Sequence, residues 1–280
     1  MKTRSLLFVL GLIVLASLIG PWISPHTVSD ISSTRLSPPS LQHLFGTDLH
    51  GRDLLTRLLY GGRISLLVGL VGATVSLFVG VTYGLIAGYL GGRADNAMMR
   101  LVDILYALPR IVLVIVLITL FDLKLKTLLD GTLLSPLAPH ARLLLLFVGL
   151  GLVEWLTLAR IVRAQVLSIK ERPFVLSARL IGQTTPTILF RQILPQVLPI
   201  VLTYLTLALP AVILEESFLS FLGLGVQAPL ASWGTLLADG AALLNPIETP
   251  WWCILFPALI LALTLLTLNF LGDQLRQPQK

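Results

Sequence analysis

Charge is scarce in this 280-residue chain. Only 12% of the residues are Asp, Glu, Lys or Arg, whereas soluble domains average roughly 25%, and 55% of the residues are hydrophobic. Long apolar runs in a chain this poor in charge are typical of a protein that crosses a membrane several times. The net charge of +6 fits that class, because cytoplasmic loops of membrane proteins gather Lys and Arg. We therefore expect a lipid bilayer, and no nucleic acid, as the environment of the chain.

Motifs of enzymatic chemistry are also missing. The single cysteine, Cys253, cannot form an internal disulfide. The chain has no G-x-x-x-x-G-K-[ST] phosphate loop, no H-E-x-x-H and no G-x-S-x-G. Of the loop histidines, His26, His43 and His50 could in principle bind a metal, but scattered loop histidines are usually only solvated. We expect no enzyme activity, no metal site and no cofactor in this chain.

Six apolar stretches are long enough to cross about 30 Å of hydrocarbon. They must be helical, because lipid offers no hydrogen-bond partner to an exposed backbone. The first follows two basic residues and could be a signal peptide, but it is long enough to span and no clear small-x-small cleavage site ends it. We expect it to be retained, which predicts an all-α polytopic membrane helix bundle with six transmembrane helices. The stretches are roughly 5–23, 64–90, 101–121, 142–162, 197–222 and 252–271.

The distribution of Lys and Arg predicts the orientation. If both termini are cytoplasmic, twelve of these residues fall on the cytoplasmic side and seven on the outer side, as the positive-inside rule favours. Residues 1–63 then form the first span and an outer loop, and residues 64–280 form the other five spans. In the outer loop, leucines from 54 to 59 repeat at helical spacing. This pattern predicts a short helix, either amphipathic at the membrane surface or simply solvated.

The cytoplasmic segment from about 163 to 196 has no place in lipid. Gly182 suits the left-handed end of a first short helix. Thr185 and Pro186 predict the N-cap and first position of a second, which Pro195 should interrupt before the next span. The result is a helical hairpin. It could rest on lipid headgroups or dock to a cytoplasmic partner, and the residues alone leave both open.

The hairpin resembles the cytoplasmic loop of ATP-binding-cassette importer permeases, in which Glu-Ala-Ala is followed by three residues, Gly, and a hydrophobic stretch closing on Leu-Pro. Here Gly182 lies thirteen residues before Pro195. Three further blocks resemble dipeptide, oligopeptide and nickel permeases, in particular the second of their two permease subunits. These blocks are FGTDLHGRDLLTRLLYGGRISLLVG, EWLTLARIVRAQVLSIKERPFV and EESFLSFLGLGVQAPLASWGTLLADG. Together the matches cover most of residues 45–240.

The resemblance implies a docking site for a separate ATPase on the hairpin. Leu176 replaces the Glu of the motif and Ser177 its first Ala, which puts the polar contact of that Glu in doubt here. Either apolar burial takes its place or the groove of the partner has changed with it. The motif positions implied to dock are Leu176, Ser177, Ala178, Gly182, Leu194 and Pro195.

The resemblance also implies the assembly. The chain would be a transport subunit, not an enzyme, that carries peptides or nickel across a bacterial plasma (inner) membrane by alternating access. Its implied partners are a second permease subunit, two ATPase subunits that hold ATP and Mg²⁺, and an extracytoplasmic substrate-binding protein.

Ionisable groups inside spans are costly and are treated as functional candidates. Glu154, Glu215 and Glu216 are candidate pathway or gate residues, and Glu216 matches a Glu of the family block. Asp103 and Arg110 are expected on one face of the third span. An ion-coupled secondary transporter that uses the three glutamates is the alternative function, and a membrane scaffold is a third.

Small residues recur every fourth position in the second span. Such a stripe lets another helix approach closely, so we expect packing there more than a pathway role. The residues are Gly72, Ser76, Gly80, Gly84 and Gly88.

Overall fold

The computed structural model describes residues 3–276, except 29, 33, 131, 133–134, 229 and 245–248. The described part is helical apart from connecting segments and one β-bridge between Thr47 and Asp53. The long helices are α1 (Thr3–Ile23), α2 (Leu54–Leu90), α3 (Gly92–Ala107), α4 (Arg110–Asp130), α5 (Ala141–Ile169), α8 (Leu194–Phe221) and α10 (Trp252–Arg276). The short ones are η1 (Ser135–His140), α6 (Pro173–Leu180), α7 (Thr185–Thr187), the π-helical turn η2 (Ile188–Ile193) and α9 (Trp233–Ala242).

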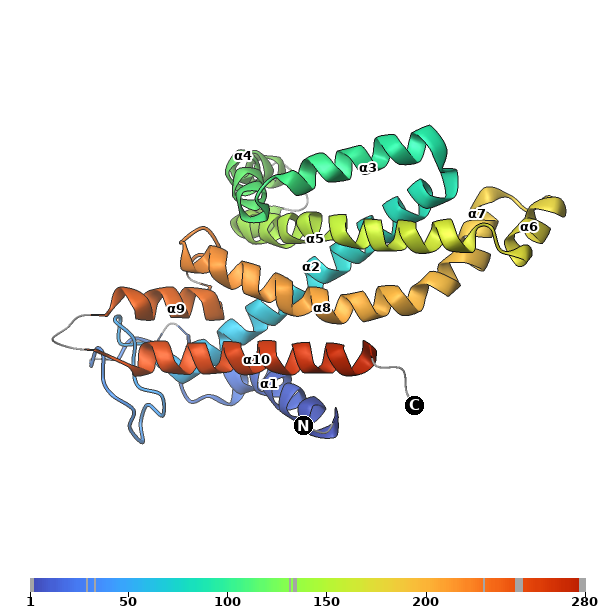
Figure 1. The fold of residues 1–280 in the computed structure, drawn as a ribbon. Coiled ribbons are helices and arrows are strands. Elements are labelled where there is room, and N and C mark those ends of the chain that lie inside the picture. Colours follow the sequence, from blue (N-terminus) through green and yellow to red (C-terminus); the bar gives the residue numbers. More distant parts are fainter. Residues whose placement is uncertain are drawn as a thin grey trace.

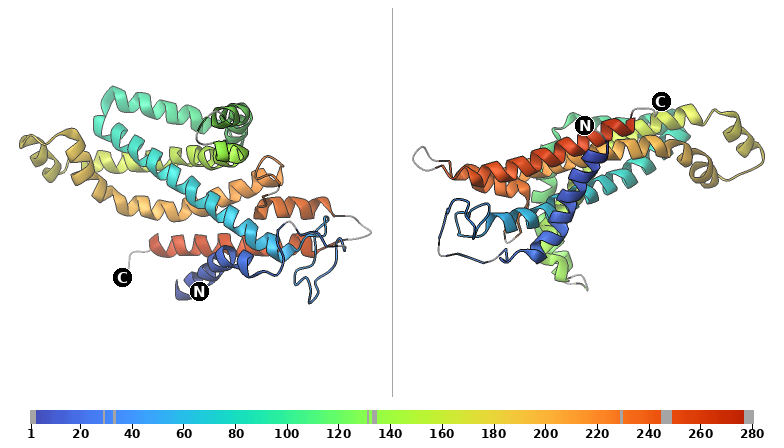
Figure 2. Two further views of the ribbon diagram at one scale, coloured as in Figure 1. Left: turned by 180° about the vertical axis from the view of Figure 1, so that it is seen from behind. Right: turned by 90° about the horizontal axis from the view of Figure 1, so that it is seen from below.

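The helices form the predicted membrane bundle. Five of the described helices are long and apolar enough to cross a membrane, and a sixth span results if α3 and α4 count as one. In Figures 1 and 2 the hairpin of α6 and α7 projects from one end of the bundle, and residues 24–53 lie with α9 at the opposite end. We call these the hairpin end and the loop end. Helices α1 and α10 pack together, and the first turns of α1 lie near the last turns of α10 (Figures 1 and 2).

The third predicted span, 101–121, is not one straight helix. The chain breaks between α3 and α4, whose axes are bent by 91°. Leu108 has extended backbone angles (φ −83°, ψ 141°), because the ring of Pro109 disfavours a helical conformation for the residue before it. Asp103 and Arg110 therefore lie on different helices, and the expectation that they share one face is wrong.

The short helix expected around residues 54–59 is instead the first turns of α2. Asp53 caps this helix, since its side chain accepts a hydrogen bond from the Thr56 N–H. Leu54 and Leu58 are buried in a cluster with side chains of α9 and α10. The segment therefore packs against other helices as part of α2 and is not a separate short helix. The division drawn at residues 63 and 64 falls inside α2.

The stripe of small residues on α2 packs closely, mainly against α5. A Cβ added to Gly84 would lie 2.5 Å from the carbonyl oxygen of Ala159, and one added to Gly80 would lie 2.9 Å from that of Trp155. Only a residue without a side chain permits this approach. The stripe therefore serves packing, as the sequence analysis expected.

Candidate functional site

The hairpin connects α5 to α8 through two short helical pieces. Helix α6 ends in a Schellman motif, in which the Gly182 N–H donates to the carbonyl oxygen of Arg179 and the Gln183 N–H donates to that of Ala178. Gly182 has φ +79°, the left-handed conformation predicted for it. These bonds satisfy the end of α6 and give the turn a defined shape.

The second arm differs from the sequence prediction in two ways. Its N-cap is Thr184 rather than Thr185. Pro195 does not interrupt it, because α7, the π turn and α8 run on as one helical stretch from Thr185 to Phe221. In the π turn the Leu194 N–H donates to Leu189, five residues back, and this wider turn accommodates the proline ring. The hairpin is thus mechanically continuous with α8.

The hairpin has one face that is packed against its own second arm and one face that is exposed. Ala178 is only 4% exposed and packs in a cluster that includes Val175, Ile188 and Ile193. Leu176, Ser177 and Pro195 are exposed, Gly182 lies at the exposed turn, and Leu194 is half-buried. Among the motif positions, Ala178 therefore supports the fold of the hairpin and does not face outward.

Three large apolar side chains on the exposed face of the hairpin were not predicted from the sequence. Leu180 is 87% exposed, Ile181 is 74% exposed and Phe190 is also exposed. Leu180 follows Leu176 by four residues, so both lie on one face of α6. Helical spacing from Leu176 would have found Leu180.

A charge cluster joins α4, α5 and α8 beside the break between α3 and α4. Nη1 of Arg110 donates to Oε1 of Glu154 at 2.8 Å and lies 3.8 Å from Oε1 of Glu215. The hydroxyl of Tyr204 donates to Oε2 of Glu154 at 3.1 Å. Nη2 of Arg110 donates to the hydroxyl of Tyr106, on α3, at 3.1 Å. The cluster therefore links helices on both sides of the break to the centre of the bundle.

The cluster is short of positive charge. Two carboxylates share Arg110, and among the described residues Oε2 of Glu215 is buried without a hydrogen-bond partner. Glu154 is only 3% exposed, so its charge depends on Arg110 and on the Tyr204 hydroxyl. Arg110 itself is 38% exposed. The sequence named Glu154, Glu215 and Arg110 separately but could not show that they meet, and it missed both tyrosines.

Glu216 belongs to a different network, at the loop end. Its Oε1 accepts a hydrogen bond from Ser220 at 2.6 Å and its Oε2 accepts one from Ser65 at 3.3 Å. The Ser220 hydroxyl also accepts a hydrogen bond from the N–H of Val226, and the Ser65 hydroxyl accepts one from the N–H of Trp233. Glu216 is fully buried, and it ties α2 and α8 to the start of α9.

Ion pairs that were not predicted from the sequence also hold the loop end. Arg57 on α2 contacts Asp48 at 2.7 Å and Asp239 on α9 at 3.2 Å. Burial opposes the ionisation of Asp48, but the N–H of Arg52 and the charge of Arg57 outweigh it, so the pKa of Asp48 lies below its usual value. The segment before α2 is thereby fastened to α9.

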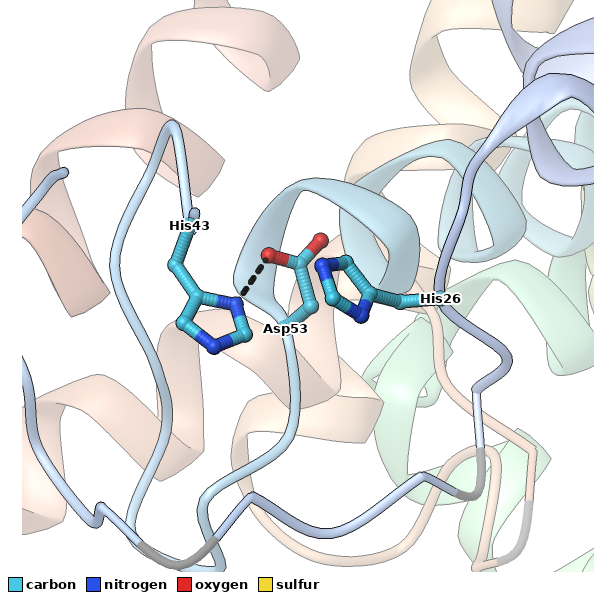
Figure 3. Close-up of side chains that lie close together, drawn as sticks. All are labelled: His26, His43 and Asp53. Carbon is cyan, nitrogen blue, oxygen red and sulfur yellow. Dashed lines mark hydrogen bonds and ion pairs between the residues drawn. The ribbon is translucent and has the colours of Figure 1, made fainter. Parts of the chain in front are cut away.

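Two of the loop histidines meet beside α2. His26 and His43 lie on either side of Asp53 (Figure 3), and one ligand atom from each residue falls within 4.8 Å of the others. His50 lies apart from this group and contacts Arg52. The sequence predicted no metal site, and Asp53 was not among its candidate ligands.

The fold has known counterparts among solved structures. Two structures of inward-facing conformations of the MetNI methionine ABC transporter superpose with TM-scores of 0.57 and 0.56. They cover 76% and 78% of this chain, and 92% and 94% of theirs, at 17% and 20% identity. The chain therefore shares its fold with these transporter chains.

The family follows from the sequence comparisons. The family model described as "Binding-protein-dependent transport system inner membrane component" matches residues 80–277. The oligopeptide transport system permease protein OppC of Haemophilus influenzae is 44% identical over 273 residues, 96% of this chain and 81% of that protein. The dipeptide transport system permease protein DppC of Bacillus subtilis is 42% identical over 271 residues, covering 96% and 78%. The chain belongs to this family of inner-membrane transport components.

Membership of the family confirms the main prediction. The chain is a permease subunit of an ATP-binding-cassette importer, a transport component and not an enzyme. It resides in the inner membrane and works in a system that depends on a substrate-binding protein and an ATPase. This result favours the importer over the ion-coupled secondary transporter and the scaffold.

Proposed function

We propose that this chain lines half of the pathway of a peptide importer. Support for the cargo comes from the named peptide permeases that match 96% of the chain, and peptides are favoured over nickel on that ground. The observation that carries the mechanism is the continuous helical stretch from the hairpin into α8. A partner that moves the hairpin moves α8 with it.

The proposed assembly has four kinds of subunit. A second permease subunit completes the pathway. Two ATPase subunits hold ATP and Mg²⁺ and bind the hairpins through the exposed face that carries Leu176, Leu180 and Ile181. An extracytoplasmic binding protein delivers the peptide at the loop end. ATP binding closes the ATPases, and the hairpins transmit this motion to the spans.

The intramembrane glutamates take two separate roles in this proposal. The cluster of Glu154 and Glu215 lies beside Arg110, which is partly exposed, so it faces the pathway and meets the peptide. Glu216 is enclosed and holds the loop end closed by tying α2 and α8 to α9. Alternating access requires such a contact to break and re-form during each cycle.

The function is tested by uptake in sealed vesicles. The chain is co-purified with candidate partner subunits from the same cell and reconstituted with labelled dipeptides and longer peptides. We expect uptake that needs ATP hydrolysis and that stops when the ATPase is inactive. Peptide uptake driven by an ion gradient without ATP would contradict the proposal and restore the secondary transporter.

The orientation is tested with two single-cysteine variants. Both carry Cys253→Ala, and one adds Thr185→Cys on the exposed hairpin while the other adds Leu41→Cys, which is 98% exposed at the loop end. Because the positive-inside rule favours a cytoplasmic hairpin, an impermeant thiol reagent should label only the Leu41→Cys variant in intact cells. Labelling of Thr185→Cys before permeabilisation would reverse the orientation.

The role of Glu216 is tested by Glu216→Gln. The amide keeps the shape of the side chain but turns one acceptor oxygen into a donor facing a serine hydroxyl. A buried hydrogen bond lost in this way costs about 1–3 kcal/mol, which weakens the closed loop end by at least about fivefold. We expect uptake to fall several-fold at an equal protein level. Unchanged uptake would remove Glu216 from the gate.

A further inference from the structure

We propose that His26, His43 and Asp53 bind one divalent transition-metal ion of the zinc class at the loop end. The three side chains converge from two parts of the irregular segment before α2 and from the N-cap of α2 itself (Figure 3). One ligand atom from each lies within 4.8 Å of the others. Ligands of a zinc ion lie about 2.0–2.2 Å from it. Side-chain rotations that move each ligand atom by about 1 Å would bring all three within that distance of one ion.

Asp53 is already oriented as a ligand. Its Oδ2 accepts hydrogen bonds from the N–H and the hydroxyl of Thr56, both at 2.8 Å. These bonds fix the carboxylate, which is 4% exposed, and leave Oδ1 directed at Nδ1 of His43, 3.0 Å away. Hydrogen bonds that hold the second oxygen of a carboxylate are a regular feature of metal sites.

The two imidazole rings complete the arrangement. The rings of His26 and His43 stack with centroids 4.8 Å apart and planes inclined by 30°. Figure 3 shows a nitrogen of each ring facing the carboxylate of Asp53. The carbonyl oxygen of Gln42 lies 3.2 Å from Nε2 of His26, which places a further oxygen donor beside the three ligands.

The donor set selects the ion. Two imidazoles and one carboxylate suit Zn²⁺ and its neighbours Co²⁺, Ni²⁺ and Cu²⁺, whereas Ca²⁺ and Mg²⁺ require oxygen ligands almost exclusively. Three protein side chains leave a coordination position for water or another oxygen donor. The ion would fasten residues 26 and 43 to the start of α2 and so stiffen the segment from residue 24 to residue 53.

The binding test uses the full chain in detergent, purified through an affinity tag without histidine and stripped with a chelator. Equilibrium dialysis should find one Zn²⁺ per chain, and Co²⁺ should give the visible absorption of a site with nitrogen and oxygen ligands. We expect His26→Ala and His43→Ala each to weaken binding by at least about tenfold. His50→Ala and His140→Ala are matched controls that should bind as the wild type does.

One further variant separates a metal site from a simple hydrogen bond between His43 and Asp53. His43→Gln can still donate a hydrogen bond to Asp53 but supplies no imidazole ligand. We expect Zn²⁺ to raise the unfolding temperature of the wild type but not of His43→Gln. The proposal is overturned if no stoichiometric Zn²⁺ binds, if His43→Gln responds like the wild type, or if the two control variants lose binding equally.

Discussion

Leu180→Asp is expected to abolish ATP-driven uptake while the bundle stays folded. Leu180 is 87% exposed at the tip of the hairpin, so in the free subunit the new carboxylate remains in water. In a docked ATPase groove the same carboxylate would be desolvated without a partner, at a cost on the order of several kcal/mol. Each 1.4 kcal/mol is a factor of ten, so we expect the ATPase to bind at least about 100-fold more weakly. Co-purification of the ATPase and peptide uptake measure the effect.

The matched control for this experiment is Leu41→Asp. Leu41 is an equally exposed leucine, but it lies at the loop end, away from the hairpin. It should leave ATPase binding unchanged. Ala178→Asp is a poor test, because Ala178 is buried inside the hairpin and its replacement would disrupt the hairpin itself. If Leu180→Asp retains the ATPase and normal uptake, the hairpin is not the coupling element.

Apolar runs and turn-forming residues were enough to predict the bundle and the hairpin. The spans follow from apolar runs, and Gly182 follows from its freedom to adopt a positive φ. The inward position of Ala178 could not be predicted, because it depends on how the two arms of the hairpin fold on each other. The second arm continues through Pro195 because of the π turn at Ile188–Ile193. No pattern in the neighbouring residues predicts that turn.

The break at Pro109 could have been predicted from the sequence, but the third span was assigned from its apolar length alone. The rule that a proline disfavours helical backbone in the preceding residue applies to Leu108 without any tertiary information. The charge cluster is a different case. Arg110, Glu154 and Glu215 come from three helices, so only the packing of those helices shows that two carboxylates share one guanidinium.

The same limit applies to the histidines. His26 and His43 are seventeen residues apart in an irregular segment without periodicity, and Asp53 reads as a helix cap. No spacing rule predicts that these three residues meet, because the irregular conformation of the loop brings them together beside the start of α2. Sites made from loops are therefore the part of this protein that sequence patterns predict least well.

Arg110→Met is expected to have the largest effect within the membrane. It leaves Glu154, which is 3% exposed, and Glu215 without their cation. Breaking a buried ion pair from one side costs about 3–5 kcal/mol, and because Arg110 is 38% exposed we expect the lower end of that range. The unfolding temperature in detergent and the amount of folded protein should both fall, and uptake should be lost.

A double variant separates stability from transport. In Arg110→Met with Glu154→Gln the more deeply buried carboxylate is removed together with its cation, a replacement that is often neutral for stability, and only Glu215 is left without its partner. We expect the unfolding temperature to recover in part, while uptake stays low because the cluster no longer presents its charges to the peptide. Arg160→Met is the matched control, since its partner Asp103 is 66% exposed and such surface pairs contribute about 0–1 kcal/mol. If the double variant recovers both stability and uptake, the cluster holds α4, α5 and α8 together and has no part in the peptide pathway.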